Sequence, residues 1–297
     1  MRHSKLLGSL AMLACVMPAM AQVDLVSNWR KTSRPIVPAE SQTTEYLAKY
    51  QVFNTDFKQL EAELHSIPVQ STGPITTGRI FSMPNPNGTI SRFKIAESPI
   101  MTEELQRQTT SRTYRVQGID DPYATGRLDI GVNGFHAYVT TPNGSYIIDP
   151  IKRSNLNEYV VYFRKDNLTP RNFTCYTETA EKSRLDPSNF VQAFAFGTLK
   201  TYRLAMNATV EYTNYYGGVT NATAAVVTTI NRVNQVYERD LAIRMILVRN
   251  NCYSGAANSD PYSNNNGVAM LSQNQTVCDS TVGNANYDIG HVFSTGG

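Results

Sequence analysis

The stretch that decides the fold is Leu241–Val248, which reads LAIRMILV and is almost continuously apolar. Such a run is typical of a strand buried on both faces. Ahead of it, Thr220–Glu238 places apolar residues at steps of three and four, the spacing of one helix face. Lys200–Tyr212 alternates in the manner of a strand. Strand, helix and strand in this order predict a βαβ unit, so the C-terminal segment begins an α/β domain.

The N-terminal half has a different pattern. Arg79–Phe163 contains short runs rich in Ile, Val, Tyr, Phe and Thr, separated by turn-forming sequences. The clearest piece is a hairpin over Phe135–Ile148 with Asn143-Gly144 as its turn. Before it, Thr55–Ser66 has helical spacing of apolar residues behind Thr55 as a plausible N-cap. The pattern predicts a mostly antiparallel β domain preceded by a short amphipathic helix.

The first 21 residues have the features of a secretory leader. Arg2 and Lys5 form a positive start, Leu6–Val16 is apolar, and Ala19-Met20-Ala21 is a small-residue cleavage site. The apolar run is shorter than the roughly 20 residues that span a bilayer, and no later segment is apolar enough to do so. We therefore expect secretion, to the extracellular space or the periplasm. The alternative, a lipid anchor on Cys15, rests on a poor match to the usual lipid-attachment box.

Charge excludes two classes of partner. The formal net charge is +3, and loss of the leader with Arg2 and Lys5 leaves 3 − 2 = +1. So small a charge argues against nucleic acid or an anionic membrane surface as partners.

Three cysteines remain after the leader: Cys175, Cys252 and Cys278. In an oxidising compartment an even set would pair, so one is left over. Cys252 and Cys278 flank a single polar loop, and we expect a disulfide between them. Cys175 lies in the polar, charged stretch Thr169–Asn189, which has little periodicity and is interpreted as an exposed linker. It is the odd thiol.

Several sequence segments in both halves resemble those of a known protein family. FKIAESPIM (93–101), YRVQGIDDP (114–122) and GFHAYVTTPNGSYIIDP (134–150) look like the propeptide of a bacterial, reprolysin-like metzincin zinc metalloprotease. VNQVYERDLAIRMILV (233–248), QNQTVCDS (273–280) and NYDIGHVFSTGG (286–297) look like the first part of its catalytic domain. The resemblance implies an α+β propeptide domain followed by the incomplete α/β, metzincin-like N-terminal part of a protease domain. The expected division is 1–21 signal peptide, 22–168 propeptide-like domain, 169–198 linker and 199–297 incomplete catalytic domain.

The resemblance also implies a zinc cofactor, held in this family by a helix carrying HExxHxxGxxH. This sequence contains no such motif, because its histidines, His3, His65, His136 and His291, stand singly. We therefore carry no catalytic residue and no zinc ligand over to it, and expect the motif in a longer parent protein. One residue is a candidate inhibitory zinc ligand in the zymogen, namely Cys175, although its surroundings are not a recognised switch motif. A free thiol or an intermolecular disulfide is the alternative.

Other polar residues have simpler interpretations. His136 and His291 stand in strand-like contexts and favour structural roles over metal binding, and His65 is expected to be exposed. Asp260 and Asn264–Asn266 could surround calcium, but their spacing is not that of an EF-hand and favours polar turns. Glu238–Asp240 could suggest acid–base chemistry; a solvated helix end with local ion pairs is favoured.

Two functions are compatible with these observations. The first is a precursor fragment of a secreted zinc endopeptidase that hydrolyses proteins or peptides, inactive by itself because the zinc site is absent. The second is a secreted, non-enzymatic binding or inhibitory module that retains the propeptide fold. An in-frame HExxHxxGxxH in the coding sequence beyond Gly297 would distinguish them.

Overall fold

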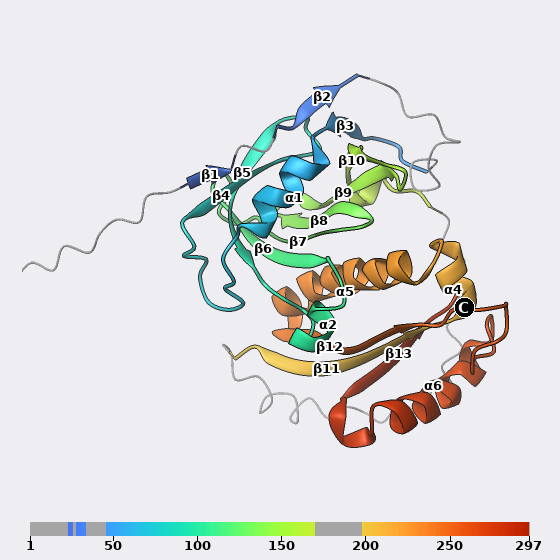
Figure 1. The fold of residues 1–297 in the computed structure, drawn as a ribbon. Coiled ribbons are helices and arrows are strands. Elements are labelled where there is room, and N and C mark those ends of the chain that lie inside the picture. The colour runs from blue at the N-terminus through green and yellow to red at the C-terminus, as the bar shows by residue number, and fades with distance from the viewer. Residues whose placement is uncertain (1–22, 26–27, 34–45, 170–197, 297) are drawn as a thin grey trace, which may run out of the picture.

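A large curved sheet and a small parallel sheet lie on either side of the long helix α5 (Val219–Leu241), as Figure 1 shows. The structure is a computed structural model that describes residues 23–25, 28–33, 46–169 and 198–296. The proposed leader, most of the proposed linker and Cys175 therefore lie outside the described residues.

The large sheet has ten strands in the order β1-β4-β5-β6-β7-β8-β9-β10-β3-β2. Its neighbours are antiparallel except for the pair β1 and β4. The strands are β1 (Val23–Leu25), β2 (Arg30–Thr32), β3 (Gln51–Asn54), β4 (Arg79–Pro84), β5 (Ile90–Glu97), β6 (Arg112–Gly118), β7 (Thr125–Gly131), β8 (Gly134–Thr141), β9 (Gly144–Lys152) and β10 (Asn155–Phe163). The predicted antiparallel β region is confirmed. The predicted hairpin is present, but its turn residues are Pro142 and Asn143 rather than Asn143-Gly144, because Thr141 pairs with Gly144, the first residue of β9. The φ of Gly144 is 115°, a value that suits glycine.

The core of this part lies between the sheet and α1 (Phe57–His65). Leu60 and Leu64 of α1 are buried in one cluster with aromatic rings from several strands, among them Phe81, Phe135 and Tyr159. The predicted helix is confirmed, but its N-cap is Asp56, which accepts a hydrogen bond from the Gln59 amide at 3.1 Å. Thr55 is buried instead.

The C-terminal segment forms the predicted βαβ unit. β11 (Lys200–Ala208) pairs in parallel with β12 (Ile243–Cys252), and α5 connects them after the short α4 (Val210–Tyr215). β13 (Ile289–Phe293) pairs in parallel with the other side of β11. The predicted strand over Lys200–Tyr212 is too long, because Thr209 accepts a hydrogen bond from the Tyr212 amide at 3.2 Å and starts α4.

The two faces of the small sheet carry different helices (Figure 1). Leu204, Met206 and Ala208 face α5, whereas Ala205 and Asn207 face α6 (Gly267–Thr281). This alternation follows from the two-residue period of a strand. The sequence of the α6 region predicts a polar loop, because its apolar residues follow no stripe. Instead a helix forms, and four of its residues are buried: Met270, Asn274, Val277 and Cys278.

A piece of the N-terminal half completes the small sheet. The Leu247 amide donates to the Ile100 carbonyl at 2.7 Å, and the Thr102 amide donates to the Leu247 carbonyl at 3.0 Å. Ile100 and Met101 are buried in the same cluster as Leu204 and Val226, and α2 (Glu103–Gln106) follows them. The outer edge of β12 is thereby covered by residues that precede it by well over a hundred positions. None of the described helices has the length and apolar character needed to cross a membrane.

Candidate functional site

The candidate site is the polar face of α5, which packs against β7, β8 and β9 of the large sheet. The opposite, apolar face of α5 contributes Ala222, Val226 and Ile230 to the core beneath the small sheet. The polar face carries Thr228, Asn231, Arg232, Gln235 and Glu238, and each of these side chains bonds to the large sheet. Helix α5 therefore joins the two halves by apolar packing on one side and by charged and hydrogen-bonded contacts on the other.

The C-terminal end of this face holds an ion cluster around Glu238. Its carboxylate accepts hydrogen bonds from Arg127 of β7 at 2.7 Å and from Arg244 of β12 at 2.6 and 3.1 Å. Arg127 is 1% exposed and Arg244 6% exposed in their side chains. Burial lowers the pKa of Arg127 to about 10, although Glu238 opposes the shift. Burial alone would raise the pKa of Glu238, but its bonds to the two arginines lower it. Arg127 and Glu238 are therefore both charged at neutral pH.

This cluster corrects the sequence interpretation. Glu238 was expected at a solvated helix end, yet it is mostly buried and bridges both halves. Arg239 and Asp240 do form the expected exposed local pair, at 2.6 Å. The tertiary structure is the reason, because the partners of Glu238 come from strands. One partner, Arg127, lies 111 residues away in sequence. The register also sets Arg115 directly opposite Arg127, a like-charge pair that needs compensation.

In the middle of the face, uncharged side chains of α5 form hydrogen bonds to the large sheet. Thr228 donates to Asp129 Oδ2 at 2.6 Å, and the Asn231 amide donates to the Leu128 carbonyl at 2.8 Å. Burial raises the pKa of Asp129, against the charges and hydrogen bonds that surround it. On the other side of the helix, Asn234 bonds to both the amide and the carbonyl of Met245, each at 2.8 Å. These side chains fix the register of α5 against both sheets.

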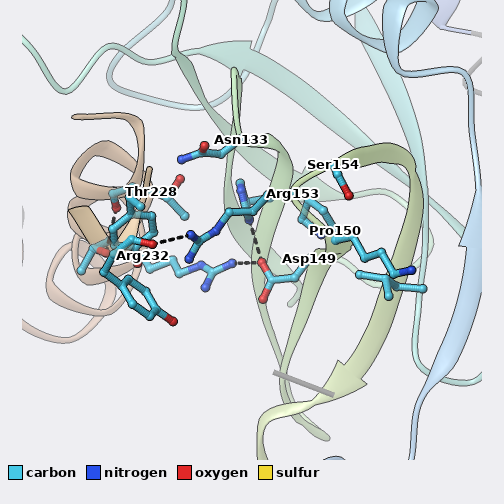
Figure 2. Close-up of a pocket in the computed structure, with 14 residues that line it drawn as sticks. Asn133, Asp149, Pro150, Arg153, Ser154, Thr228 and Arg232 are labelled. Carbon is cyan, nitrogen blue, oxygen red and sulfur yellow. Dashed lines mark hydrogen bonds and ion pairs between the residues drawn. The ribbon is translucent and has the colours of Figure 1, made fainter. Parts of the chain in front are cut away.

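The N-terminal half of the face lines a cleft of about 760 Å³, shown in Figure 2. Asp149 lies at its base. Its carboxylate contacts Arg232 and His136 Nδ1, the latter at 2.7 Å, and accepts a hydrogen bond from the Tyr162 hydroxyl at 3.2 Å. Burial alone would raise the pKa of Asp149, but Arg232 and His136 outweigh it and hold this pKa at about 2. The carboxylate is therefore ionised at neutral pH.

The charged side chains at the polar face of α5 keep their protonation state near neutral pH and are poorly suited to proton transfer. A general acid or base works best with a pKa near the working pH, whereas Asp149 and Arg127 titrate far from neutrality. Across residues 23–25, 28–33, 46–169 and 198–296, no three His, Cys, Asp or Glu side chains come together in a way that could hold a metal ion. Side chains in these ranges therefore do not form the zinc site that the family resemblance implies.

The histidines are dispersed. His136 bonds Asp149, as a structural histidine would, but its Nε2 is buried and no described residue bonds it. His291 is exposed on β13, with its ring 5.0 Å from that of Phe293, and His65 is exposed as expected. In the Asp260 loop, the carboxylate accepts bonds from the amides of Val210 and Tyr262 at 2.6 and 2.9 Å. This is the polar turn chemistry that the sequence favours.

The predicted disulfide is not formed in the structure, where Cys252 and Cys278 are separate buried thiols. Cys252 lies on the α5 face of the small sheet, 3.7 Å from the Thr223 hydroxyl. Cys278 lies on the α6 face, 3.5 Å from the Asn207 amide. The sheet separates the two sulfur atoms, which a bond of about 2 Å cannot bridge. The disulfide was predicted on the assumption that the residues between the two cysteines form one loop. In the structure α6 places Cys278 on the face of the small sheet opposite to Cys252.

Comparisons with known proteins give one family match. Residues 198–297, about a third of the chain, match the model described as metallo-peptidase family M12B, reprolysin-like. The match supports a reprolysin-like metallopeptidase, a class whose members are hydrolases of peptide bonds and generally depend on zinc. No curated protein matches the chain. Among solved structures, one titled "Structure of a chaperone-substrate complex" is 12% identical and covers 43% of this chain and 95% of its own, with a TM-score of 0.29.

Proposed function

We propose that this chain is part of the precursor of a secreted zinc endopeptidase that hydrolyses proteins or peptides. The observation that carries the proposal is the agreement between family match and fold: the matched residues 198–297 include the whole parallel unit of β11, α5, β12 and β13. The leader-like residues 1–21 support export. In this proposal the large sheet is the propeptide, and the small sheet opens the protease domain.

The polar face of α5 supports the role given to the large sheet. An interface that will later separate must leave surfaces that water can solvate, and such interfaces are more polar than permanent ones. The contacts of Glu238 with Arg127 and of Arg232 with Asp149 are ionic, and those of Thr228 and Asn231 are hydrogen bonds. Departure of a propeptide docked on this face would uncover a largely polar face of α5, together with the apolar edge of β12 that Ile100 and Met101 cover.

The chain as printed is expected to be inactive. Hydrolysis in this class needs a positioned metal ion and a general base, and the sequence has no HExxHxxGxxH. We therefore assign no catalytic role to His136, Asp149 or Glu238.

Two measurements test the proposal. Purified chain should contain no stoichiometric zinc and should not cleave a peptide library; chelator-sensitive cleavage with one tightly bound zinc per chain would overturn the predicted inactivity. The coding sequence beyond Gly297 is then read. An in-frame HExxHxxGxxH supports the protease, and the extended protein should lose cleavage when the motif's glutamate is replaced by glutamine. A stop codon with no such motif downstream would refute the protease and favour the non-enzymatic module.

A further inference from the structure

The cleft at the N-terminal half of α5 is built from both halves of the chain. Asn133, His136 and Asp149–Ser154 come from the large sheet, whereas Tyr215, Tyr216 and Arg232 come from α4 and α5. In Figure 2 the side chains of Arg153 and Arg232 extend into the space between the end of β9 and α5. Two guanidinium groups from different halves thus share one concave site.

The charge of the carboxylate at the base of the cleft is matched by groups other than Arg153. Asp149 already contacts Arg232, His136 and Tyr162, so its charge is matched inside this group. Arg232 Nε and His136 Nε2 are both buried and have no hydrogen-bond partner among the described residues. Buried polar groups are nearly always paired. Arg232 Nε is a donor, and His136 Nε2 becomes one in the imidazolium form, because Nδ1 faces Asp149; a ligand oxygen is the kind of acceptor that both would take.

Arg153 brings a second positive charge to the mouth of the cleft. Its guanidinium carbon lies 4.3 Å from the ring centre of Tyr216 and 5.1 Å from that of Tyr215, and Nη1 donates to the Tyr215 carbonyl at 3.1 Å. These contacts are with neutral groups, and no described carboxylate pairs with Arg153. The tyrosine rings hold its position while most of its five N–H donors stay available.

We propose that this cleft binds an oxyanion, either a carboxylate or a phosphate group, between Arg232 and Arg153. An arginine fork matches both kinds of anion, because two parallel N–H groups meet two oxygen atoms. The imidazolium form of His136 would add a donor from Nε2. Because Arg153 belongs to the large sheet and Arg232 to α5, the bound anion would tie the two halves together. This inference rests on the cleft alone and does not depend on the protease assignment.

The test measures the thermal unfolding midpoint of the full chain during titration with inorganic phosphate or acetate. Ionic strength is held constant with sodium chloride, so that screening does not change. A saturable rise of the midpoint is expected, because a ligand that binds only the folded state stabilises it. A rise with phosphate alone assigns a phosphate site, a rise with acetate alone assigns a carboxylate site, and a rise with both assigns a general oxyanion site.

Matched variants locate the site. Arg153→Gln should weaken the apparent affinity at least tenfold, and Arg153→Lys should weaken it less, because it keeps the charge but loses the fork. Arg30→Gln, an equal charge change at an exposed position on β2, should bind as the wild type does. No saturable response to either anion, or an equal response in Arg153→Gln and wild type, would overturn the proposal.

Discussion

Replacement of Glu238 by glutamine is the sharpest test of how the two halves are joined. The substitution keeps the size of the side chain and removes its charge. Within the part of the chain that the structure describes, Glu238 is the only carboxylate that bonds Arg127 and Arg244, which are 1% and 6% exposed. Glu238 Oε1 accepts from both arginines and Oε2 from Arg244 alone. A glutamine NH₂ group in place of Oε2 would face Arg244 Nη2 with donor against donor, and the remaining neutral oxygen would be a weaker acceptor for both arginines.

The expected loss in free energy of unfolding is large because the buried arginine Arg127 keeps its charge. Arg127 has a pKa of about 10 with Glu238 present. Loss of the carboxylate lowers this pKa further and leaves a buried cation without a counter-charge. Removing one partner of a buried ion pair typically destabilises a protein by about 3–5 kcal/mol. The side chain of Glu238 is 19% exposed, which admits some screening by water, and we therefore expect about 3 kcal/mol.

Urea unfolding of the full chain measures this loss. Trp29, the only tryptophan, is buried in the core of the large sheet and reports on it by fluorescence, while circular dichroism reports on the helices. With a slope of about 1–3 kcal/mol per molar urea, the midpoint should fall by about 1 M or more. Asp240→Asn breaks only the exposed pair with Arg239 and should leave the midpoint unchanged. Equal midpoints for Glu238→Gln and Asp240→Asn would refute the buried cluster, whereas partial recovery in Glu238→Gln combined with Arg127→Met would support it.

Three further outcomes follow from the same contacts. Alkylation of the unreduced, denatured chain should label both Cys252 and Cys278, and a peptide pair linked through the two would contradict their placement on opposite faces. The folded-state pKa of Asp149, about 2, lies below the unfolded value of about 3.9; its stabilising contribution, about 2 kcal/mol, is therefore present above pH 4 and lost as the pH falls towards 2. The stability gap between wild type and Asp149→Asn should narrow over that range, and a gap independent of pH would count against the ion pair. Asn234→Ala should destabilise the chain by about 2–4 kcal/mol, because two buried backbone groups of Met245 lose their partner; a loss within error would show that water replaces the side chain.

The sequence predicted elements whose signals are local. The apolar run LAIRMILV and the stripe before it predicted β12 and α5, although β12 begins at Ile243 and extends to Cys252. Asn143-Gly144 predicted a hairpin turn, and helical spacing predicted α1. Helix α6 was missed, because a helix that packs through a few scattered residues and exposes Val268 and Leu271 shows no apolar stripe.

By itself, the sequence determined the secondary structure of periodic segments, the parallel order of the βαβ unit and the similarity to reprolysin-like metallopeptidases. Each of these depends on neighbouring residues or on short motifs. Tertiary structure alone decided which charges meet, since Arg127 lies 111 residues from Glu238, and Arg232 lies 83 residues from Asp149. It also decided that Cys252 and Cys278 face opposite ways. The physical reason is that the energy of a buried charge or thiol depends on what the fold places around it, and residue spacing along the chain carries no record of those neighbours.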